Sequence, residues 1–454
     1  MRWEAMAPYR VLVVDDSAFM RKIISDLILQ DGQFEIAATA SNGLEAVMMA
    51  AELKPDVMTM DLEMPKMNGL DALQLIMKAG PIPIIMLSGI SEDNTRDTIK
   101  ALQFGAFDFI RKPTVGTSGD DINHVGEQLL EKLKTAVLAK RSSRSVLAEG
   151  SAQKLASAEL TQTADTLQGE APSKPKPASK LVRGGLTDKP ASPLTQAKSN
   201  TYASKTDKTT KTERTERGKP QSLGGKTIVP RAKEEPPAAA PSTKLKLSST
   251  AHNPASKGKQ AETFKHLVAI GTSTGGPRAL HEVICSLPGS FPAPVLIVQH
   301  MPPRFTKSLA QRLDSFSELN VHEAEQGMRV AAGHAYIAPG GYHMELAKDG
   351  AGYFIRLTEA PQRNGHRPSV DVMFESLLSF KELERHAVVM TGMGSDGARG
   401  LKALLDNGAA TTIAEAEETC IVYGMPRSAV ECGAAQKVLP LQQIASKLVS
   451  AVIN

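Results

Sequence analysis

A stretch of about 120 residues in the middle of the chain is too poor in apolar residues to build a core. From 141 to 262 the sequence consists mainly of Lys, Thr, Ser, Ala, Pro and Gln, and its one aromatic residue is Tyr202. So little apolar surface does not offset the conformational entropy that ordering would cost. We therefore expect a flexible, low-complexity linker at 141–262, which divides the chain into two folded regions.

The linker also carries a net positive charge, unlike the rest of the chain. It contains 22 basic and 11 acidic residues, whereas the whole 454-residue chain has a net charge of only +4. The two flanking regions are therefore mildly acidic. Acidic folded regions, and a basic stretch almost without aromatic residues to stack on bases, predict that nucleic acid is not a partner.

Cysteine usage and hydropathy predict a location for the protein. Three cysteines lie far apart, at Cys285, Cys420 and Cys432, and an odd, sparse set argues against a disulfide framework. The first residues lack the apolar core of a secretory signal, and no apolar run reaches the roughly 18 residues that span a bilayer. We expect a soluble, cytoplasmic protein without membrane insertion.

The first region, up to about residue 140, alternates short apolar runs with segments long enough for a helix. The runs are RVLVVDD, FEIAATA, PDVMTMD, IPIIMLS and FDFIRKP. This alternation predicts a doubly wound, flavodoxin-like parallel sheet with helices on both faces. Such sheets carry functional groups at the carboxyl ends of their strands, where this sequence has Asp15, Asp16, Asp61, Ser88 and Lys112.

Three carboxylates at one sheet edge repel one another unless a cation lies among them. Asp15, Asp16 and Asp61 offer the hard oxygen ligands that Mg²⁺ prefers. The alternative is that each aspartate only caps the next helix. Five polar groups at matching strand ends favour the magnesium site over capping.

The segments LVVDDS, MDLEMPKMNG, LSG and RKP resemble the response-regulator receiver family over 9–130. The resemblance implies that Asp61 accepts a phosphoryl group from a histidine kinase, with Mg²⁺ held by Asp15, Asp16 and Asp61. It also implies a cis peptide before Pro113. The positions that it assigns to sensing the phosphoryl group and to switching are Ser88, Lys112 and Phe109. Plain core packing is the alternative for the aromatic residue.

In the second region, 263–454, the alternation of strands and helices returns. HLVAIG, PVLIVQH, HAVVMTG and ATTIAE have the pattern of buried strands that end in glycine-containing turns. The segment HAYIAPGGYHMELAKDGAGYFIRL has turn signals and short strands instead. We therefore predict a Rossmann-like parallel-sheet domain with an antiparallel insertion.

The turn after HLVAI contains a candidate nucleophile. Residues 271–275 match G-x-S-x-G between a strand and a helix, with Ser273 at the centre. In such a turn the N–H of the next residue, Thr274, contributes to an oxyanion hole. A glycine-rich turn that binds a phosphate, and a serine that only caps the helix, remain alternatives.

A serine nucleophile needs a base and an orienting carboxylate. The candidate bases are His300, His343 and His366, and the candidate carboxylates are Asp371 and Asp396. His300 and Asp396 each follow a predicted strand, but spacing does not exclude His366 with Asp371. No histidine of this region has metal-ligand spacing, so we expect no cofactor in the catalytic domain.

The motifs IGTSTGG, VQHMPPRFT, HAYIAPGGYHMEL, HRPSVDVMFES, TGMGSDGARG and CIVYGMPRSAV resemble the chemotaxis protein-glutamate methylesterase domain. The resemblance extends from about Phe264 to the end of the sequence. It implies Ser273 as nucleophile, His300 as general base and acid, and Asp396 as orienting carboxylate. It also implies that the backbone N–H of Met393 stabilises the oxyanion.

The resemblance implies an activity and its control. The expected reactions are hydrolysis of glutamate methyl esters on the cytoplasmic helices of chemoreceptors, with release of methanol, and deamidation of receptor glutamines. We expect the unphosphorylated receiver to block the catalytic mouth, an effect that a long linker would weaken. The alternative is a non-catalytic signalling protein whose second domain binds a nucleotide or a partner.

Overall fold

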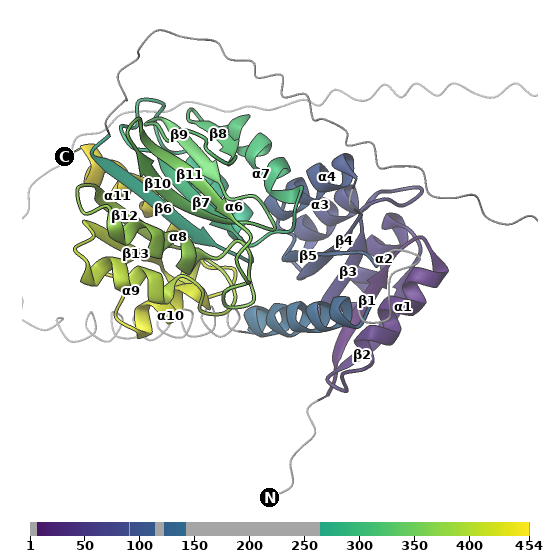
Figure 1. Ribbon diagram of the computed structural model, residues 1–454. Helices are drawn as coiled ribbons and strands as arrows, with labels where there is room; N and C mark the ends of the chain where they lie inside the picture. The colour runs from purple at the N-terminus through teal and green to yellow at the C-terminus, as the bar shows by residue number, and fades with distance from the viewer. Residues whose placement is uncertain (1–6, 90, 114–121, 142–263, 454) are drawn as a thin grey trace, which may run out of the picture. The chain divides into compact units, whose positions relative to one another are not determined.

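The computed structural model describes residues 7–89, 91–113, 122–141 and 264–453, which form two α/β regions (Figure 1). Almost all of the predicted linker, 141–262, lies outside the described residues. Within the described part of the chain, no helix is long and apolar enough to cross a membrane.

The first region is a five-stranded parallel sheet in the order β2-β1-β3-β4-β5. Its strands are β1 (Tyr9–Val14), β2 (Phe34–Ala40), β3 (Val57–Asp61), β4 (Ile84–Ser88) and β5 (Asp108–Arg111). Its helices are α1 (Ala18–Ile28), α2 (Gly43–Leu53), α3 (Gly69–Ala79) and α4 (Glu92–Gln103), and residues 122–141 are also helical. The order and the parallel pairing confirm the doubly wound fold.

Alternating side chains of β1 separate the two faces of this sheet. Leu12 and Val14 pack in one buried cluster with residues of α2, α3 and α4, among them Leu73. Val11 and Val13 pack in another cluster with residues of α1 and of the helical segment 122–141. Both faces are covered, which is why the strands are almost continuously apolar.

The second region is a seven-stranded parallel sheet in the order β14-β13-β12-β6-β7-β9-β8. Its strands are β6 (His266–Thr272), β7 (Val295–Gln299), β8 (Asn320–Glu323), β9 (His334–Ile337), β12 (Glu384–Val389), β13 (Thr411–Glu415) and β14 (Lys437–Leu439). An antiparallel hairpin of β10 (His343–Asp349) and β11 (Gly352–Thr358) is inserted between β9 and β12. The Rossmann-like sheet and its antiparallel insertion are confirmed.

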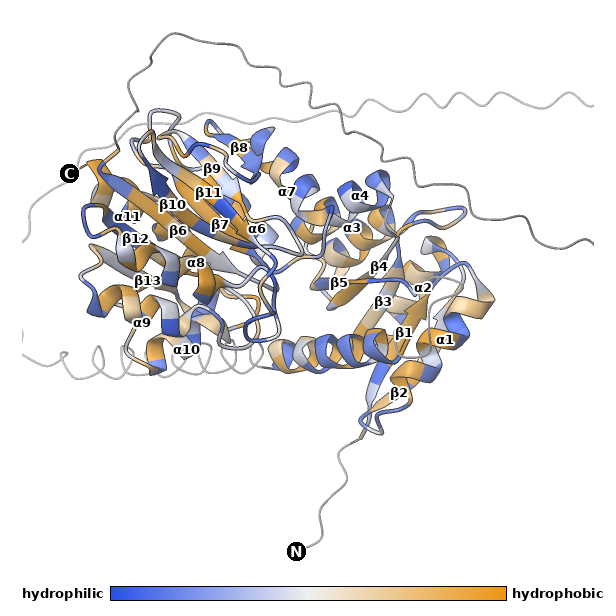
Figure 2. Cartoon of the chain, in the orientation of Figure 1, coloured by the Kyte–Doolittle hydropathy of each residue, from blue (hydrophilic) through white to orange (hydrophobic). Residues whose placement is uncertain are grey.

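Helices cover both faces of this second sheet, and their apolar sides face the strands (Figure 2). Apolar residues of α6, α7 and α11 share one buried cluster with Val268 and Ile270 of β6. Those of α8, α9 and α10 share another with Leu267 and Ala269. The helices are α6 (Gly276–Ile284), α7 (Phe305–Asp314), α8 (Val370–Ser376), α9 (Ala398–Asp406), α10 (Met425–Glu431) and α11 (Leu441–Ile453).

One expectation about the backbone is wrong. Within the described residues the cis peptide bond is Arg367-Pro368 and not the bond before Pro113.

Candidate functional site

The acidic cluster of the first region forms as the sequence predicts. Asp15, Asp16 and Asp61 each place a carboxylate oxygen within 4.8 Å of the others. Lys112 Nζ lies 2.7 Å from Asp15 Oδ2 and 2.7 Å from Asp61 Oδ2. Burial, together with the neighbouring Asp15, raises the pKa of Asp61 to about 6 against the opposing effect of Lys112. The cluster offers only oxygen ligands, and its negative charge exceeds the positive charge of Lys112 beside it. Such a cluster fits Mg²⁺.

Helix capping does not account for these aspartates. The side chain of Ser17 accepts the capping hydrogen bond at the start of α1, and that of Asn68 does so at the start of α3. The carboxylate of Asp61 instead faces Asp15 and Lys112. The capping alternative is therefore wrong for the phosphoacceptor candidate.

Ser88 and Phe109 are both buried. Ser88 Oγ lies 2.6 Å from Thr98 Oγ1 of α4. The ring of Phe109 stacks on that of Phe305, with ring centroids 4.5 Å apart. The aromatic side chain therefore packs against a residue of the second region, and its switching role remains a prediction.

Removing the buried charge should stabilise the metal-free receiver. The pKa of Asp61 in the folded chain, about 6, is above its ordinary value of 3.8, so its ionisation destabilises the fold as the pH rises through this interval. We expect Asp61→Asn to raise the urea midpoint of the receiver at about pH 7.5 without Mg²⁺, and to have little effect near pH 4. Asp26→Asn, at an exposed carboxylate paired with Lys22, is the control. An unchanged midpoint at pH 7.5 would contradict the expectation.

The candidate nucleophile lies between β6 and α6. Ser273 donates its N–H to Thr391 O, and its carbonyl accepts from Gly276 N–H at 2.8 Å and from Gln299 Nε2 at 2.9 Å. The helix α6 has no side-chain cap, so the alternative in which Ser273 only caps the helix is wrong. Its hydroxyl is left available for chemistry.

The glycines of this turn are required by packing and by backbone conformation. Gly275 has φ +81°, a backbone conformation that residues with a side chain rarely adopt. A Cβ on Gly271 would lie 2.2 Å from Val370 Cγ1, and a Cβ on Gly276 would lie 1.9 Å from Gln299 Oε1. Neighbouring groups of the same domain therefore explain the glycines, and a bound phosphate is not needed to explain them.

The candidate base His300 and the candidate carboxylate Asp396 are paired. His300 Nε2 lies 2.8 Å from Asp396 Oδ2, and both side chains are buried. Asp396 also accepts hydrogen bonds from Ser369 Oγ, Val370 N–H and Asn364 Nδ2. Burial by itself raises the pKa of Asp396, but the hydrogen bond and the charge of His300, and then the hydrogen bonds from Val370 and Asn364, outweigh it and hold the pKa well below the usual range.

The second ring nitrogen of His300, Nδ1, is not bonded to Asp396. Among the described residues, His300 Nδ1 is buried without a hydrogen-bond partner. Ser273, His300, Thr274 and Met393 line one cavity of about 580 Å³. With Nε2 bonded to Asp396, the candidate base has one ring nitrogen left unbonded, on a side chain that lines the same cavity as the candidate nucleophile.

The remaining candidates have other partners. His343 is fully buried, with Nε2 3.0 Å from Pro361 O and Nδ1 accepting the N–H of Ser369. Asp371 Oδ1 accepts from the N–H groups of Gly397 and Gly400 and so holds the start of α9. The structure therefore pairs His300 with Asp396, and Asp371 orients the loop that carries the latter.

Sequence reasoning missed the residues that support the site. Gln299 joins the nucleophile turn to the end of β7, and Asn364 binds Asp396 from a turn 32 residues away. The Asn364–Gly365 pair is a hairpin-turn signal that could have drawn attention to this segment. Gln299 had no comparable signal.

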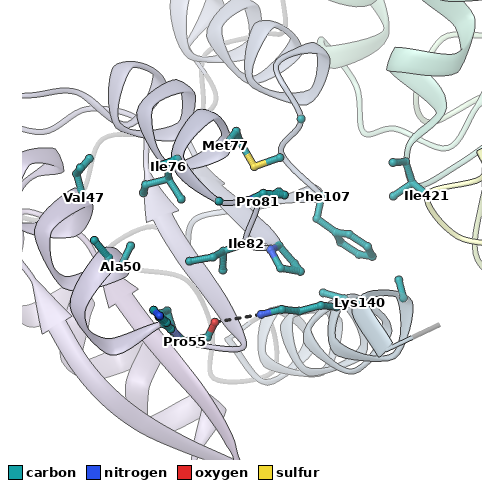
Figure 3. Close-up of a pocket in the computed structure, with 18 of the residues that line it drawn as sticks. Val47, Ala50, Pro55, Ile76, Met77, Pro81, Ile82, Phe107, Lys140 and Ile421 are labelled. Atoms are coloured by element: carbon teal, nitrogen blue, oxygen red, sulfur yellow. Dashed lines mark hydrogen bonds between the residues drawn. The ribbon is translucent and has the colours of Figure 1, made fainter. Parts of the chain in front are cut away.

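A larger apolar cavity, of about 740 Å³, lies away from both sites (Figure 3). Most of its lining comes from segments of the receiver that precede β3, β4 and β5, including Pro55, Ile82 and Phe107, together with Ile421. Lys140 Nζ donates to Pro55 O at its edge. Ser273 and His300 line the smaller, more polar cavity instead, so the candidate chemistry is assigned there.

The close approach of Gly271 and Val370 leads to a test of the nucleophile turn. We expect Gly271→Ala to cost about 1–3 kcal/mol of unfolding free energy by overpacking, and to lower activity because Ser273 is displaced. Val370→Ala removes both contacting methyl groups, so the double variant should cost at least about 1 kcal/mol less than the sum of the single variants. Urea unfolding measures this coupling.

The control is Gly350→Ala, because a Cβ on Gly350 meets nothing within 4 Å. The change in unfolding free energy caused by Gly350→Ala should simply add to that caused by Val370→Ala. If the unfolding costs of Gly271→Ala and Val370→Ala simply add in the double variant, the contact between these two residues does not govern the turn.

The chain is similar to known proteins along most of its length. The family model described as CheB methylesterase matches residues 268–448, and the response regulator receiver domain matches 11–118. A relative from Geobacillus kaustophilus, named protein-glutamate methylesterase/protein-glutamine glutaminase, is 38% identical over 98% of this chain and 99% of its own length. A relative of the same name from Thermotoga maritima is 38% identical over 98% of each chain.

Among solved structures, the catalytic domain of the Thermotoga maritima CheB methylesterase is 47% identical, with a TM-score of 0.41; the match covers 42% of this chain and 100% of that one. The family is shown by the two relatives, which align over nearly their full length. The chain belongs to the protein-glutamate methylesterase/protein-glutamine glutaminase family, with a receiver domain followed by a methylesterase domain.

Proposed function

We propose that this protein is a phosphorylation-activated serine esterase of chemotaxis-type adaptation. It hydrolyses glutamate methyl esters on the cytoplasmic helices of chemoreceptors, releasing methanol, and deamidates receptor glutamines. The observation that carries the proposal is the buried His300–Asp396 pair, whose histidine lines one cavity with Ser273 of the G-x-S-x-G turn. The proposed limits are 9–130 for the receiver, 141–262 for the linker and 263–454 for the catalytic domain, and the proposed location is the cytoplasm.

In the acylation step Ser273 Oγ attacks the ester carbonyl carbon while His300 Nδ1 accepts the hydroxyl proton. Asp396 holds the ring through Nε2 and stabilises the imidazolium that forms. His300 then gives the proton to the departing methoxide, and methanol leaves an acyl-enzyme on Ser273. With a glutamine substrate the same steps release ammonia.

In the second step His300 Nδ1 takes a proton from water, which attacks the acyl carbon. His300 then gives this proton to Ser273 Oγ as the bond between Oγ and the acyl carbon breaks, which restores the serine and releases the glutamate side-chain carboxyl group. Negative charge on the carbonyl oxygen develops in both steps. The N–H groups of Met393 and Thr274 are the proposed donors to it, because both residues line the cavity beside Ser273. No metal is proposed in the catalytic domain.

The receiver is proposed to control this chemistry. Asp61 would accept the phosphoryl group from a histidine kinase, and Asp15, Asp16 and Asp61 would hold a Mg²⁺ that offsets the added charge. Lys112 already contacts Asp61 and would pair with the phosphoryl group. Ser88 would turn toward the phosphoryl group and give up its bond to Thr98 of α4.

Side-chain contacts support inhibition by the unphosphorylated receiver. Thr274 Oγ1, next to the nucleophile, donates to Asp108 Oδ2 of β5 at 2.6 Å. Thr95 of α4 shares a hydrogen bond of 2.8 Å with Ser308 of α7. Because Thr95 and Thr98 lie one helical turn apart on α4, movement of Ser88 would disturb the helix that contacts α7.

The esterase proposal is tested by methanol release from methylated receptor membranes. With Mg²⁺ and acetyl phosphate, wild type should release methanol faster than without the phosphodonor, and Ser273→Ala should lower the rate at least about 100-fold. Ser286→Ala, at an exposed serine after α6, should have no effect. Release by Ser273→Ala at the wild-type rate would rule out the nucleophile. No release by wild type would favour another ester or the non-catalytic alternative.

Inhibition by the receiver is tested with the contact between Asp108 and Thr274. Asp108→Ala should raise methanol release by the unphosphorylated chain toward the rate of a fragment that begins near Lys259. The matched control is Asp31→Ala, because Asp31 pairs with Lys134 as Asp108 pairs with Lys132, but belongs to the receiver alone. Equal rates for the full chain and the fragment, without phosphodonor, would exclude inhibition.

A further inference from the structure

A two-residue turn reaches two members of the proposed triad at once. Arg363 and His366 exchange both backbone hydrogen bonds, at 3.0 and 2.9 Å. Between them Asn364 has φ +54° and Gly365 has φ +80°. An Asn-Gly pair with both residues in the left-handed region is the preferred chemistry of a tight hairpin turn, so this turn has a defined shape.

The first of its central side chains holds the triad carboxylate. Asn364 Nδ2 lies 2.8 Å from Asp396 Oδ1 and 2.9 Å from Asp371 Oδ2. Its Oδ1 accepts from Arg399, which fixes the orientation of the amide. Asn364 therefore bridges the triad carboxylate to the carboxylate that anchors α9.

The last residue of the turn covers the triad imidazole. The rings of His366 and His300 are stacked, with centroids 3.7 Å apart and planes 11° apart. Burial, and then the neighbouring His300, lower the pKa of His366 to about 4, so its ring is neutral near pH 7. The other charged groups near it are Asp396 and Lys132.

We propose that the turn 363–366 is a clamp on the triad and that His366 is a positioning residue for His300. The stacked ring keeps the plane of His300 such that Nε2 faces Asp396 and Nδ1 faces Ser273. This inference rests on the proposed roles of Ser273, His300 and Asp396.

The physical reason is that one hydrogen bond does not hold an imidazole ring in one plane. The ring of His300 can turn about the bond to its Cβ and can tilt about its hydrogen bond to Asp396. A parallel ring at 3.7 Å removes both freedoms. A neutral ring face also attracts the positive charge that His300 gains when it accepts the serine proton. Both effects act on the chemical step.

The kinetic test compares three substitutions of His366 in the full chain, with Mg²⁺ and acetyl phosphate present. His366→Phe keeps a flat ring, His366→Leu keeps comparable bulk without one, and His366→Ala removes both. We expect the Leu and Ala variants to lose about 3- to 10-fold in kcat with KM within about twofold, and the Phe variant to retain most of the activity.

A spectroscopic test does not depend on activity. In ¹⁵N-histidine-labelled full chain, His300 should give one tautomer, protonated at Nε2, with a downfield proton shared with Asp396. In His366→Ala this signal should broaden or show a second tautomer, whereas His366→Phe should keep it. Circular dichroism melting of each variant separates this effect from unfolding.

Two outcomes contradict the clamp. The first is that His366→Ala keeps the wild-type kcat and the wild-type His300 signal. The second is that His366→Phe is as impaired as His366→Ala, because a flat stacked ring would then not be enough to position His300. Failure of the triad itself is recognised separately, because Ser273→Ala would then release methanol like wild type.

Discussion

The buried carboxylate of Asp396 is the group around which the catalytic domain is organised. A carboxylate removed from water is tolerated only when its oxygens are hydrogen-bonded. Those bonds come from the end of β7, through His300, and from the segment before and at the start of α8, through Asn364, Ser369 and Val370. Segments far apart in the chain must therefore meet at the carboxyl edge of one parallel sheet, where the nucleophile turn also ends.

The two proposed sites compensate buried negative charge in opposite ways. The negative charge of Asp396 is stabilised by fixed groups of the protein. The carboxylate therefore stays ionised and holds His300 in one orientation. Asp15 and Asp61 share a single lysine, Lys112, and remain undercompensated. A permanent set of partners suits a catalytic group that must not move, whereas incomplete compensation suits a site whose charge changes with a cation and a phosphoryl group.

Contacts of β5 and α4 link these two chemistries. Asp108 opens β5 and accepts from Thr274 of the nucleophile turn, while Thr95 and Thr98 of α4 contact Ser308 and Ser88 respectively. In the proposed switch, a change at Ser88 would be transmitted by α4. Each of these hydrogen bonds contains at least one hydroxyl group. A hydroxyl can exchange one partner for another at little cost in free energy.

The sequence by itself determined the two parallel α/β regions, because runs of apolar residues separated by helix-length segments have few other ways to be buried. It also located Asp15, Asp16, Asp61, Ser88 and Lys112, since strand ends converge in such a sheet. Motif resemblance added Ser273, His300 and Asp396 as the expected triad.

Only the tertiary structure decided which ring nitrogen of His300 faces Asp396, and that His366 is stacked on the base and is not itself paired with Asp371. It also showed that Gly271 is small because Val370 lies against it. These facts depend on side chains that lie tens of residues or more apart in the sequence. No local pattern records such contacts, because they arise when separate elements pack.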